Sequence, residues 1–381
     1  MGYSGGLRPG RSGQQEVCRL SPHRTPAGSP TPSSGARRPS RPHAPTVKDV
    51  AAAAGVSWKT VSNVVNNTGR VGDETRDRVR RVITELGYQP SMAGRQLRRG
   101  RTGIIGLAVP DIQSPYFSRL AHEVMDLAQK RSYRVLIAET SGDVELERSV
   151  ARGFGVQLLD GLIFSPLGLT LSDADQSREG TPTVLLGERP AGATAPLSTD
   201  HVAIDNVRAA WDITGYLLST GRRRPAFLGC EPSGAHRSAE PRLHGFVEGL
   251  AEAGLEPVPE RLIPVESFTR RAGYRAATGA LSVLRKADAL VCANDMLALG
   301  AMAAMRAAGL RVPADVAVTG WDDVDDAAYA SPSLTTVSPD IGALAGEALD
   351  RLIARIDGSP LHPDQLEDLS IPYRIVVRAS T

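Results

Sequence analysis

The stretch TVKDVAAAAGVSWKTVSNVVNN, residues 46–67, predicts two short helices joined by a tight turn. Thr46 can cap the first helix, with Asp49 three residues later completing a capping pair. Gly55 ends that helix, and Ser57 can cap the second one. The pattern is typical of a helix-turn-helix, in which the second helix lies in the major groove of DNA.

The second predicted helix has two unlike sides. Helical spacing directs three valines into a small core: Val61, Val64 and Val65. The outward side carries the candidates for reading bases: Trp58, Lys59 and Asn63. Lysine can donate to guanine, asparagine can pair with adenine, and an indole can contact a thymine methyl or a sugar face. For Trp58 the alternative is a partly buried core position. Short polar residues suit phosphate contacts: Ser57, Thr60, Ser62 and Asn66.

A third helix is expected from about Asp73, where acidic residues suit the helix dipole. Its apolar stripe consists of Val79, Val82, Ile83 and Leu86, and Gly87 closes it. Three such helices enclose only a small core, which has the size of a DNA-binding module and is too small for an enzyme active site.

Charge is distributed unevenly along the 381 residues, although the formal net charge is only +2. Residues 1–45 hold seven arginines and one acid, and residues 46–101 hold eleven Lys and Arg against five Asp and Glu. The rest of the chain is therefore acidic, which suggests that only the N-terminal part meets a polyanion.

Residues 1–45 are rich in Pro, Ser, Gly and Arg, so we expect a disordered basic tail. It is either an arm that adds nonspecific DNA affinity, or a dispensable extension or over-long start.

Several classes of protein are excluded by what the sequence lacks. No apolar run reaches the roughly 18–20 residues that span a membrane, and no secretory signal is evident, so a cytoplasmic protein is expected. The three cysteines have no CxxC spacing and support neither disulfides nor a metal site. There is no P-loop, GxGxxG after a strand, GxSxG or HExxH, so we expect neither an enzyme nor a cofactor.

From Thr102 onward, apolar strand-like runs alternate with helical ones. Strands are expected at 103–110, 133–140, 160–166, 183–188, 202–205, 225–230, 289–294, 315–321 and 373–380. Helices are expected at 117–131, 207–220, 241–253, 271–285, 296–308 and 341–357. This alternation predicts an α/β core of two doubly wound parallel-sheet lobes, with a ligand between them at the carboxyl ends of the strands.

Between these parts, Pro90 breaks the chain, and residues 91–99 then suit only a short helix. Gly94 weakens that helix by about 1 kcal/mol relative to alanine, and an isolated two-turn helix is unstable in water. It should fold only when something holds it.

Taken together, these motifs resemble the LacI-type (lactose/purine repressor) family of bacterial transcription factors. The resemblance begins with the N-terminal signature from residue 46 through RRGRTGIIGLAVPD and continues through VAIDN, RLHGF, VCANDMLALGAM, GLRVPADVAVTGWDD and SPSLTTV. It covers nearly everything from residue 46 to the C-terminus.

The resemblance implies a homodimer, or a tetramer, that reads pseudo-palindromic double-stranded operator DNA, and an effector domain with the periplasmic-binding-protein fold. The family's base-reading positions fall on Trp58, Lys59 and Asn63. Residues 91–98 match a hinge helix that orders on operator DNA.

In that hinge, the family inserts a leucine into the minor groove and kinks the DNA. The matching residue is Leu97, accompanied by Met92 and Arg95. Gly94 departs from the family, in which a better helix former is usual at this position.

The resemblance also implies ligand contacts in the cleft by Tyr116, Phe117, Arg242, Phe268, Asn294 and Asp322, with Asp205 close by. An arginine fork and a carboxylate can bind vicinal hydroxyls, while aromatic rings stack on a sugar face or a base. Other roles stay open: Phe117 and Phe268 as core, Asp322 as a turn cap, and Arg242 paired with Glu240 or Glu248.

We therefore expect a sequence-specific transcriptional regulator, as a repressor, whose operator affinity changes when a small polar effector binds. A sugar is the first choice of effector and a nucleoside the second. The alternative is a solute-binding protein of the same fold, which would have a secretion signal and no helix-turn-helix. The expected domains are 1–45 (tail), 46–90 (DNA-binding), 91–101 (hinge) and 102–381 (effector binding and dimerisation).

Overall fold

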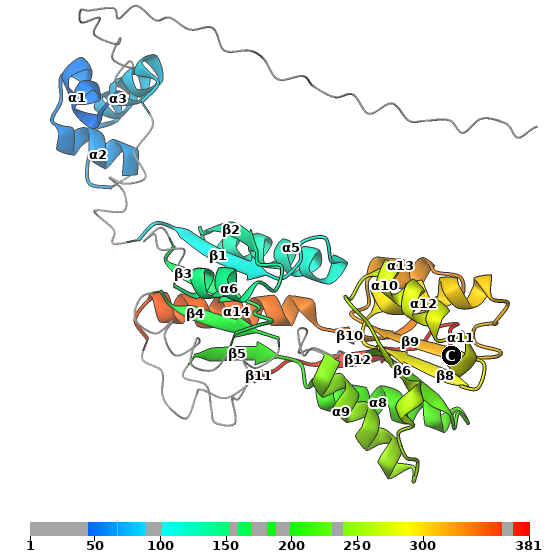
Figure 1. Ribbon diagram of the computed structural model, residues 1–381. Coiled ribbons are helices and arrows are strands. Elements are labelled where there is room, and N and C mark those ends of the chain that lie inside the picture. Colours follow the sequence, from blue (N-terminus) through cyan, green and yellow to red (C-terminus); the bar gives the residue numbers. More distant parts are fainter. Residues whose placement is uncertain are drawn as a thin grey trace, which may run out of the picture. The chain divides into compact units, whose positions relative to one another are not determined.

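The computed structural model describes residues 45–66, 68–88, 101–152, 159–169, 181–187, 199–230, 239–359 and 369–381. The chain divides into two compact units, Met1–Pro90 and Ser91–Thr381 (Figure 1). Almost all of the expected tail, and the hinge residues Met92, Arg95 and Leu97, lie outside the described residues.

The first unit contains the helices α1 (Val47–Ala54), α2 (Trp58–Asn66) and α3 (Asp73–Leu86). The expected capping pair is present, because the Thr46 hydroxyl accepts from the Asp49 amide while the Asp49 carboxylate accepts from the Thr46 amide at 2.7 Å. Gly55 adopts a left-handed φ of 66° that closes α1. The core joins all three helices through Val50, Ala51, Ala54, Val61, Val64, Val79 and Val82.

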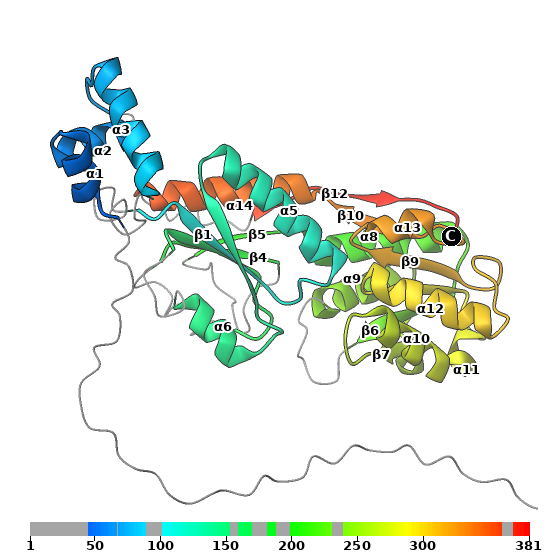
Figure 2. The ribbon, with the colours of Figure 1, turned by 90° about the horizontal axis from the view of Figure 1, so that it is seen from above.

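The second unit contains two lobes, and lobe 1 is built on a six-stranded sheet of order β11-β5-β4-β3-β1-β2 in which all pairs are parallel. Helices α5 and α14 cover one face and α6 covers the other (Figure 2). The strands are β1 (Ile104–Val109), β2 (Arg134–Glu139), β3 (Gly161–Phe164), β4 (Thr183–Leu186), β5 (Asp200–Ala203) and β11 (Leu369–Ser370). The helices are α5 (Pro115–Lys130), α6 (Val144–Ala151) and α14 (Ile341–Ile356).

Lobe 2 has the matching strand order, β12-β10-β9-β8-β6-β7, with only β12 antiparallel to its neighbour. Helices α8 and α9 lie on one side of this sheet and α10, α12 and α13 on the other (Figure 1). The strands are β6 (Pro225–Cys230), β7 (Leu262–Pro264), β8 (Ala289–Cys292), β9 (Ala317–Trp321), β10 (Thr335–Pro339) and β12 (Tyr373–Val376). The helices are α8 (Asn206–Ser219), α9 (Ala239–Glu252), the short 3₁₀-helix η3 (Pro259–Arg261), α10 (Arg270–Gly279), α11 (Leu281–Leu284), α12 (Asp295–Ala307) and α13 (Asp325–Tyr329).

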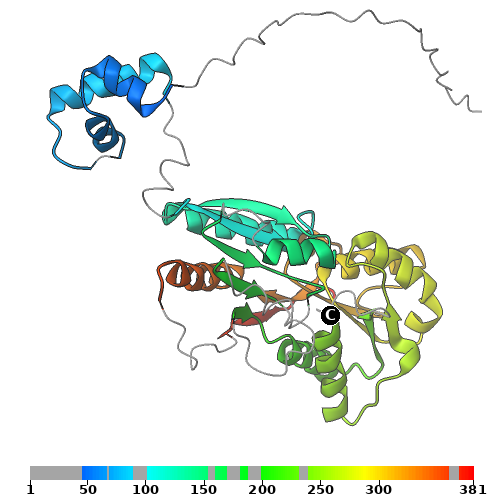
Figure 3. The same ribbon diagram turned by 60° about the vertical axis from the view of Figure 1, so that its left-hand side comes forward.

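The chain passes between the lobes three times, after β5, after β10 and after β11 (Figure 3). Two backbone hydrogen bonds tie these crossovers together: Ile371 N donates to Ala203 O at 2.7 Å, and Asp340 N donates to Pro372 O at 3.1 Å. The lobes are therefore joined by a narrow set of strands, an arrangement that allows hinge motion between them.

The α/β prediction is confirmed, and each expected strand has a counterpart. The helix expected at 271–285 is instead two helices, α10 and α11. Strand β10 was not predicted because its threonines look polar in the sequence, whereas in the sheet they are fully buried. The Thr336 hydroxyl, for example, donates to Asp295 at 2.7 Å. Within the described ranges, no helix has both the length and the apolar character needed to cross a membrane.

Candidate functional site

The candidate base-reading residues lie along α2, whose valines face the small core. Val61 is fully buried, whereas the Trp58 side chain is 55% exposed and Lys59 is also exposed. The exposed indole agrees with the outward position expected from helical spacing. Asn63 is half-buried, and its amide lies so close to Gly69 that a Cβ on that glycine would come within 2.8 Å of Nδ2. Gly69, with a φ of +70°, therefore shapes the loop around Asn63.

The four phosphate candidates form two hydrogen-bonded pairs. Ser57 Oγ accepts from Thr60 N at 3.1 Å and is hydrogen bonded to Thr60 Oγ1 at 2.9 Å, so it caps α2 as expected. Asn66 Nδ2 donates to the carbonyl oxygen of Ser62 at 2.7 Å and to its hydroxyl at 3.2 Å. Ser62 is only 8% exposed, so a phosphate contact by its hydroxyl would require this pairing to change.

Arg101 anchors the beginning of the second unit's described part. Its guanidinium donates to Ile356 O at 2.7 Å and to Asp357 Oδ1 at 2.5 Å, at the C-terminus of α14. The next residues are held by Asp160, whose carboxylate accepts from the amides of Thr102 and Gly103 at 2.6 and 2.7 Å. The point at which the expected hinge meets lobe 1 is thus fixed to α14 and to the start of β3.

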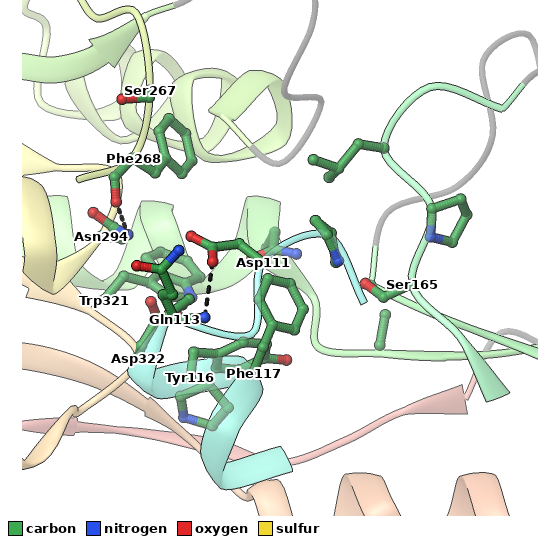
Figure 4. Close-up of a pocket in the computed structure, with 18 of the residues that line it drawn as sticks. Asp111, Gln113, Tyr116, Phe117, Ser165, Ser267, Phe268, Asn294, Trp321 and Asp322 are labelled. Carbon is green, nitrogen blue, oxygen red and sulfur yellow. Dashed lines mark hydrogen bonds between the residues drawn. The ribbon is translucent and has the colours of Figure 1, made fainter. Parts of the chain in front are cut away.

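A cavity of about 380 Å³ lies where the strands of both lobes end, as expected for doubly wound sheets. Figure 4 shows Asn294, Trp321 and Asp322 of lobe 2 on one side and Ser165 of lobe 1 on the other, with Phe117 between them. The lining includes six of the residues predicted from the sequence: Tyr116, Phe117, Arg242, Phe268, Asn294 and Asp322.

The Arg242 guanidinium is held in place by lobe 2. Its Nε donates to Asn206 Oδ1 at 3.0 Å, and Nη1 donates to Ala293 O at 2.5 Å. The guanidinium carbon lies 4.3 Å from the ring centroid of Trp321, in cation–π geometry. Arg242 therefore does not pair with Glu240 or Glu248, and Glu248 instead contacts His244 at 3.2 Å. A guanidinium fixed in this way is oriented before any ligand arrives.

Asp322 ends β9 in a conformation that is unusual for a residue other than glycine, with a φ of 105°. Only 9% of the residue is exposed, and its carboxyl accepts no hydrogen bond from any residue that the structure describes. Burial raises the pKa of Asp322 to about 7, and the positive charge of Arg242 opposes that rise. The carboxyl does not cap a turn, which leaves it able to accept hydrogen bonds from a ligand.

Asp295 supports the loop that carries Asp322. Its carboxyl is fully buried and accepts from Val324 N at 2.9 Å and from the Thr336 hydroxyl at 2.7 Å. Gly320 leaves room for it, because a Cβ there would lie 2.1 Å from Asp295 Oδ1. Burial, followed by the nearby Asp322, raises the pKa of Asp295 well above its usual value.

Asn294 has two structural roles at the cavity. Its side-chain oxygen accepts from Leu297 N at 2.9 Å and so caps α12, and its Nδ2 donates to Phe268 O at 3.3 Å (Figure 4). Phe268 packs partly against the lobe 2 core and also lines the cavity, so its position agrees with the core interpretation and leaves its ring available to a ligand. Phe117 does the same in lobe 1.

On the lobe 1 side, the cavity is formed partly by loops whose backbone amides donate to acidic side chains. Tyr116 and Phe117 begin α5 with their ring centroids 5.0 Å apart in an edge-to-face arrangement. Glu139 accepts from Ile112 N at 3.1 Å. The fully buried Glu147 accepts from the amides of Leu167 and Gly168, both at 2.8 Å, and so holds the loop after β3.

Asp205, by contrast, is not among the residues that line the cavity. It is exposed, and its carboxylate accepts from Arg208 N at 2.8 Å as the N-cap of α8. The next residue, Asn206, lines the cavity instead and holds Arg242. The sequence analysis also missed Trp321, which reads as an ordinary strand residue although it stands directly before Asp322. No cluster of three or more potential metal ligands occurs among the described residues.

Comparison with known proteins agrees with this architecture. Residues 46–91 match the family described as bacterial regulatory proteins, lacI family, and residues 214–381 match a periplasmic binding protein-like domain. The HTH-type transcriptional regulator DegA of Bacillus subtilis (strain 168) is 33% identical over 337 residues, which cover 88% of this chain and 98% of DegA. The chain belongs to the LacI family.

Two solved structures extend the likeness of this LacI-family protein to the fold. A complex of the transcriptional regulator CelR with cellobiose is 30% identical, covers 88% of this chain and 100% of CelR, and has a TM-score of 0.66. The Lac repressor dimer bound to operator and the anti-inducer ONPF is 27% identical, covers 89% and 99%, and has a TM-score of 0.77. The relatives are helix-turn-helix transcriptional regulators and not enzymes, which favours gene regulation over the solute-binding alternative.

Proposed function

We propose that this LacI-family protein is a repressor whose operator affinity changes when a small polar effector binds in the cavity between the lobes. The observation that carries the proposal is the Asp322 carboxyl, which is nine-tenths buried and accepts no hydrogen bond from the described residues. A carboxyl that lines a cavity, is mostly removed from water and accepts no hydrogen bond from its own protein keeps its acceptor capacity for a ligand. Arg242 beside it is already oriented.

The chemistry of the cavity favours a sugar, with a nucleoside as the second choice. Asp322 can accept from one or two hydroxyls, while Arg242 Nη2, which donates to no described residue, can donate to another hydroxyl. The rings of Phe117 and Phe268 supply apolar surface for a sugar face or a base. The volume of about 380 Å³ lies within the range of about 300–1,000 Å³ usual for small-molecule sites. The relative solved with cellobiose supports the same choice.

We assign operator binding to residues 46–90, with Trp58, Lys59 and Asn63 as base readers. Residues 91–101, including Met92, Arg95 and Leu97, form the proposed hinge that enters the minor groove. Residues 102–381 bind the effector and form a homodimer, in keeping with the Lac repressor, which was solved as a dimer on its operator.

Helix α14 offers a physical connection between the effector cavity and the hinge. Leu344, in its first turn, lines the cavity, whereas Ile356 and Asp357 at its other end hold Arg101. Sixteen residues of helix span about 24 Å as one stiff element. Movement of the lobes around a ligand would therefore reach the base of the hinge through α14.

A two-step measurement tests the proposed function. Sugars and nucleosides are first screened for a rise in the thermal midpoint of the full-length protein. Each compound that raises the midpoint is then added to gel shifts with an operator selected from random DNA, at stated salt. We expect at least one compound to raise the midpoint and to change operator affinity. If none does both, the proposed function is wrong.

Replacing Asn63 with alanine tests base reading in the same gel shifts. We expect Asn63→Ala to lose preference for the selected operator by about 1–3 kcal/mol while keeping nonspecific affinity, because base contacts specify and phosphate contacts only position. The measurement compares selected and scrambled DNA. Equal weakening on both would mean that Asn63 contacts only phosphate. Glu85→Gln on the exposed side of α3 serves as the control.

Effector affinity should depend on pH through Asp322. Hydroxyls that donate to its carboxylate favour the ionised form, so binding releases the proton that burial retains up to about pH 7. We expect the affinity for a neutral ligand to rise by up to about tenfold per pH unit from 5.5 to 7 and then to level off. The charged groups that interact with Asp322 include Arg242 and Asp295. Calorimetric titrations should show this slope in the natural protein and a flat profile in Asp322→Asn.

A further inference from the structure

The charged side chains that line the cavity are acidic, with the single exception of Arg242 among the described residues. Asp111 and Glu139 come from lobe 1 and Asp322 from lobe 2. The carboxyl of Asp295 is buried next to Asp322. Its burial and the nearby Asp322 both raise the pKa of Asp295. Lobe 1 therefore presents two acidic side chains to the ligand, and lobe 2 presents the carboxyl of Asp322, which becomes negative above about pH 7.

The positive charge of Arg242 is already partly used within the protein. Two of its three nitrogens donate, to Asn206 and to the carbonyl of Ala293, and its face stacks on Trp321. Only Nη2 donates to no described residue. A phosphate or carboxylate in a buried site usually takes a bidentate arginine or several cationic and amide donors. Among the described residues, Arg242 alone cannot provide this set.

Helix N-termini could in principle supply the missing positive potential, because they commonly bind anions. Several helices in the described part of the chain begin at or next to the cavity, among them α5, α8, α10, α12 and α14. Four of these are capped by a side chain: Asp205 caps α8, Thr269 caps α10 by accepting from Ala272 N at 3.2 Å, Asn294 caps α12, and Asp340 caps α14 by accepting from Ala343 N at 2.9 Å.

The N-terminus of α5 is also a weak anion site. Pro115 at its start has no backbone N–H, and its loop carries Asp111, whose carboxylate accepts from Gln113 N at 2.8 Å (Figure 4). These helix ends are thus already capped by a side chain or lie beside an acid.

We propose that the effector carries no negative charge, and that this cavity rejects phosphorylated and carboxylated ligands in favour of neutral or amine-bearing polyols and nucleosides. The inference rests on the proposed function, because it concerns the ligand of the same cavity. The inference restricts the possible ligands by their charge, and it excludes sugar phosphates, sugar acids and nucleotides.

The test compares matched ligands on the full-length protein by calorimetric titration at pH 7.5. Each neutral sugar that raises the thermal midpoint is paired with its 6-phosphate, its uronic acid and its 2-amino derivative, and adenosine is paired with its 5′-monophosphate. We expect the anionic member of each pair to bind at least tenfold more weakly than the neutral one, and the amine to bind at least as tightly as the neutral one.

A variant then tests whether the lining acids cause the discrimination. In the double variant Asp111→Asn/Glu139→Gln, two negative charges are removed from the lobe 1 side of the cavity. The affinity deficit of the anionic ligand, meaning the factor by which it binds more weakly than its neutral partner, should therefore shrink at least threefold. Asp126→Asn, on the surface of α5 beside Lys130, removes an acid of the same lobe outside the cavity and should leave the deficit unchanged. Circular dichroism and the midpoint without ligand check that the double variant is folded.

The outcomes separate this inference from the proposed function. An anionic ligand that binds as tightly as its neutral partner, or an unchanged deficit in the folded double variant, overturns the inference while leaving an effector site intact. Neutral ligands that bind as expected without altering operator affinity overturn the proposed function and support the inference on charge. If no compound binds at all, both are overturned.

Discussion

Replacing Asp322 with alanine is expected to weaken effector binding at least about 100-fold, or about 2.8 kcal/mol, without weakening the fold. The carboxyl is nine-tenths buried and accepts no hydrogen bond from the described residues, so its removal costs the ligand-free protein no internal bond among them. The ligand, by contrast, loses a charge-assisted acceptor inside a cavity. The measurement is calorimetric titration with a compound found in the thermal screen.

The direction in which Asp322→Ala changes the stability of the ligand-free protein follows from the pKa of Asp322. The folded protein holds a proton on Asp322 up to about pH 7, whereas the unfolded chain releases it near pH 4, so the native group reduces stability as pH rises across that window. At pH 8 the midpoint of ligand-free Asp322→Ala should equal or exceed that of the natural protein. Asp205→Ala is the matched control: it removes an exposed cap of α8, should cost about 1 kcal/mol of stability, and should leave effector affinity nearly unchanged. The cavity assignment is wrong if Asp205→Ala weakens binding more than Asp322→Ala does.

Adding one methyl group at Gly245 is expected to destabilise lobe 2 by about 3 kcal/mol. Gly245 lies on α9 where that helix crosses α8, and a Cβ there would lie 2.0 Å from the carbonyl oxygen of Val207. Because the obstacle is backbone, the helices must move apart. Arg242 stands one turn earlier on α9, so the same movement would pull its guanidinium away from Asn206 on α8. Gly245→Ala should therefore lower both the thermal midpoint and the effector affinity.

Gly215→Ala provides a control within the same helix pair. Gly215 lies inside α8 without a positive φ, and a methyl group added there would meet no described atom within 4 Å. Alanine there should raise stability by about 0.5–1 kcal/mol, because it restricts the unfolded chain and suits a helix. Chemical denaturation of both variants measures the difference. Similar midpoints for the two would contradict the close approach of α8 and α9.

Much of this fold could be read from local sequence patterns. The Thr46–Asp49 capping pair, the glycine that closes α1 and the spaced valines of α2 each act within a few residues, and each is present as expected. The strand runs were recognisable because parallel strands covered on both faces are continuously apolar. Where that signal failed, as for the threonines of β10, tertiary hydrogen bonds had made polar side chains compatible with burial.

The residues that line the cavity could be predicted only from the motifs that contain them. RLHGF and GWDD led to Arg242 and Asp322 by resemblance, but nothing local distinguished Trp321 from a core residue or Asn206 from the Asp205 beside it. Those distinctions depend on the direction in which a side chain leaves the end of a strand or helix. Asp205 points back to cap its own helix, and Asn206 reaches Arg242 on α9.

The sequence by itself determined the class of protein: a helix-turn-helix followed by a doubly wound core, with the candidate base readers opposite the valines of α2. These features follow from periodicity and capping, which act over one or two helical turns. Only the tertiary structure decided the chemistry of the cavity. There an oriented arginine, a carboxyl without a partner among the described residues, and capped helix ends come together from segments spread over more than 100 residues of the chain, from Asp205 to Asp340. Burial and charge at such a site are sums over distant neighbours, and no local pattern encodes them.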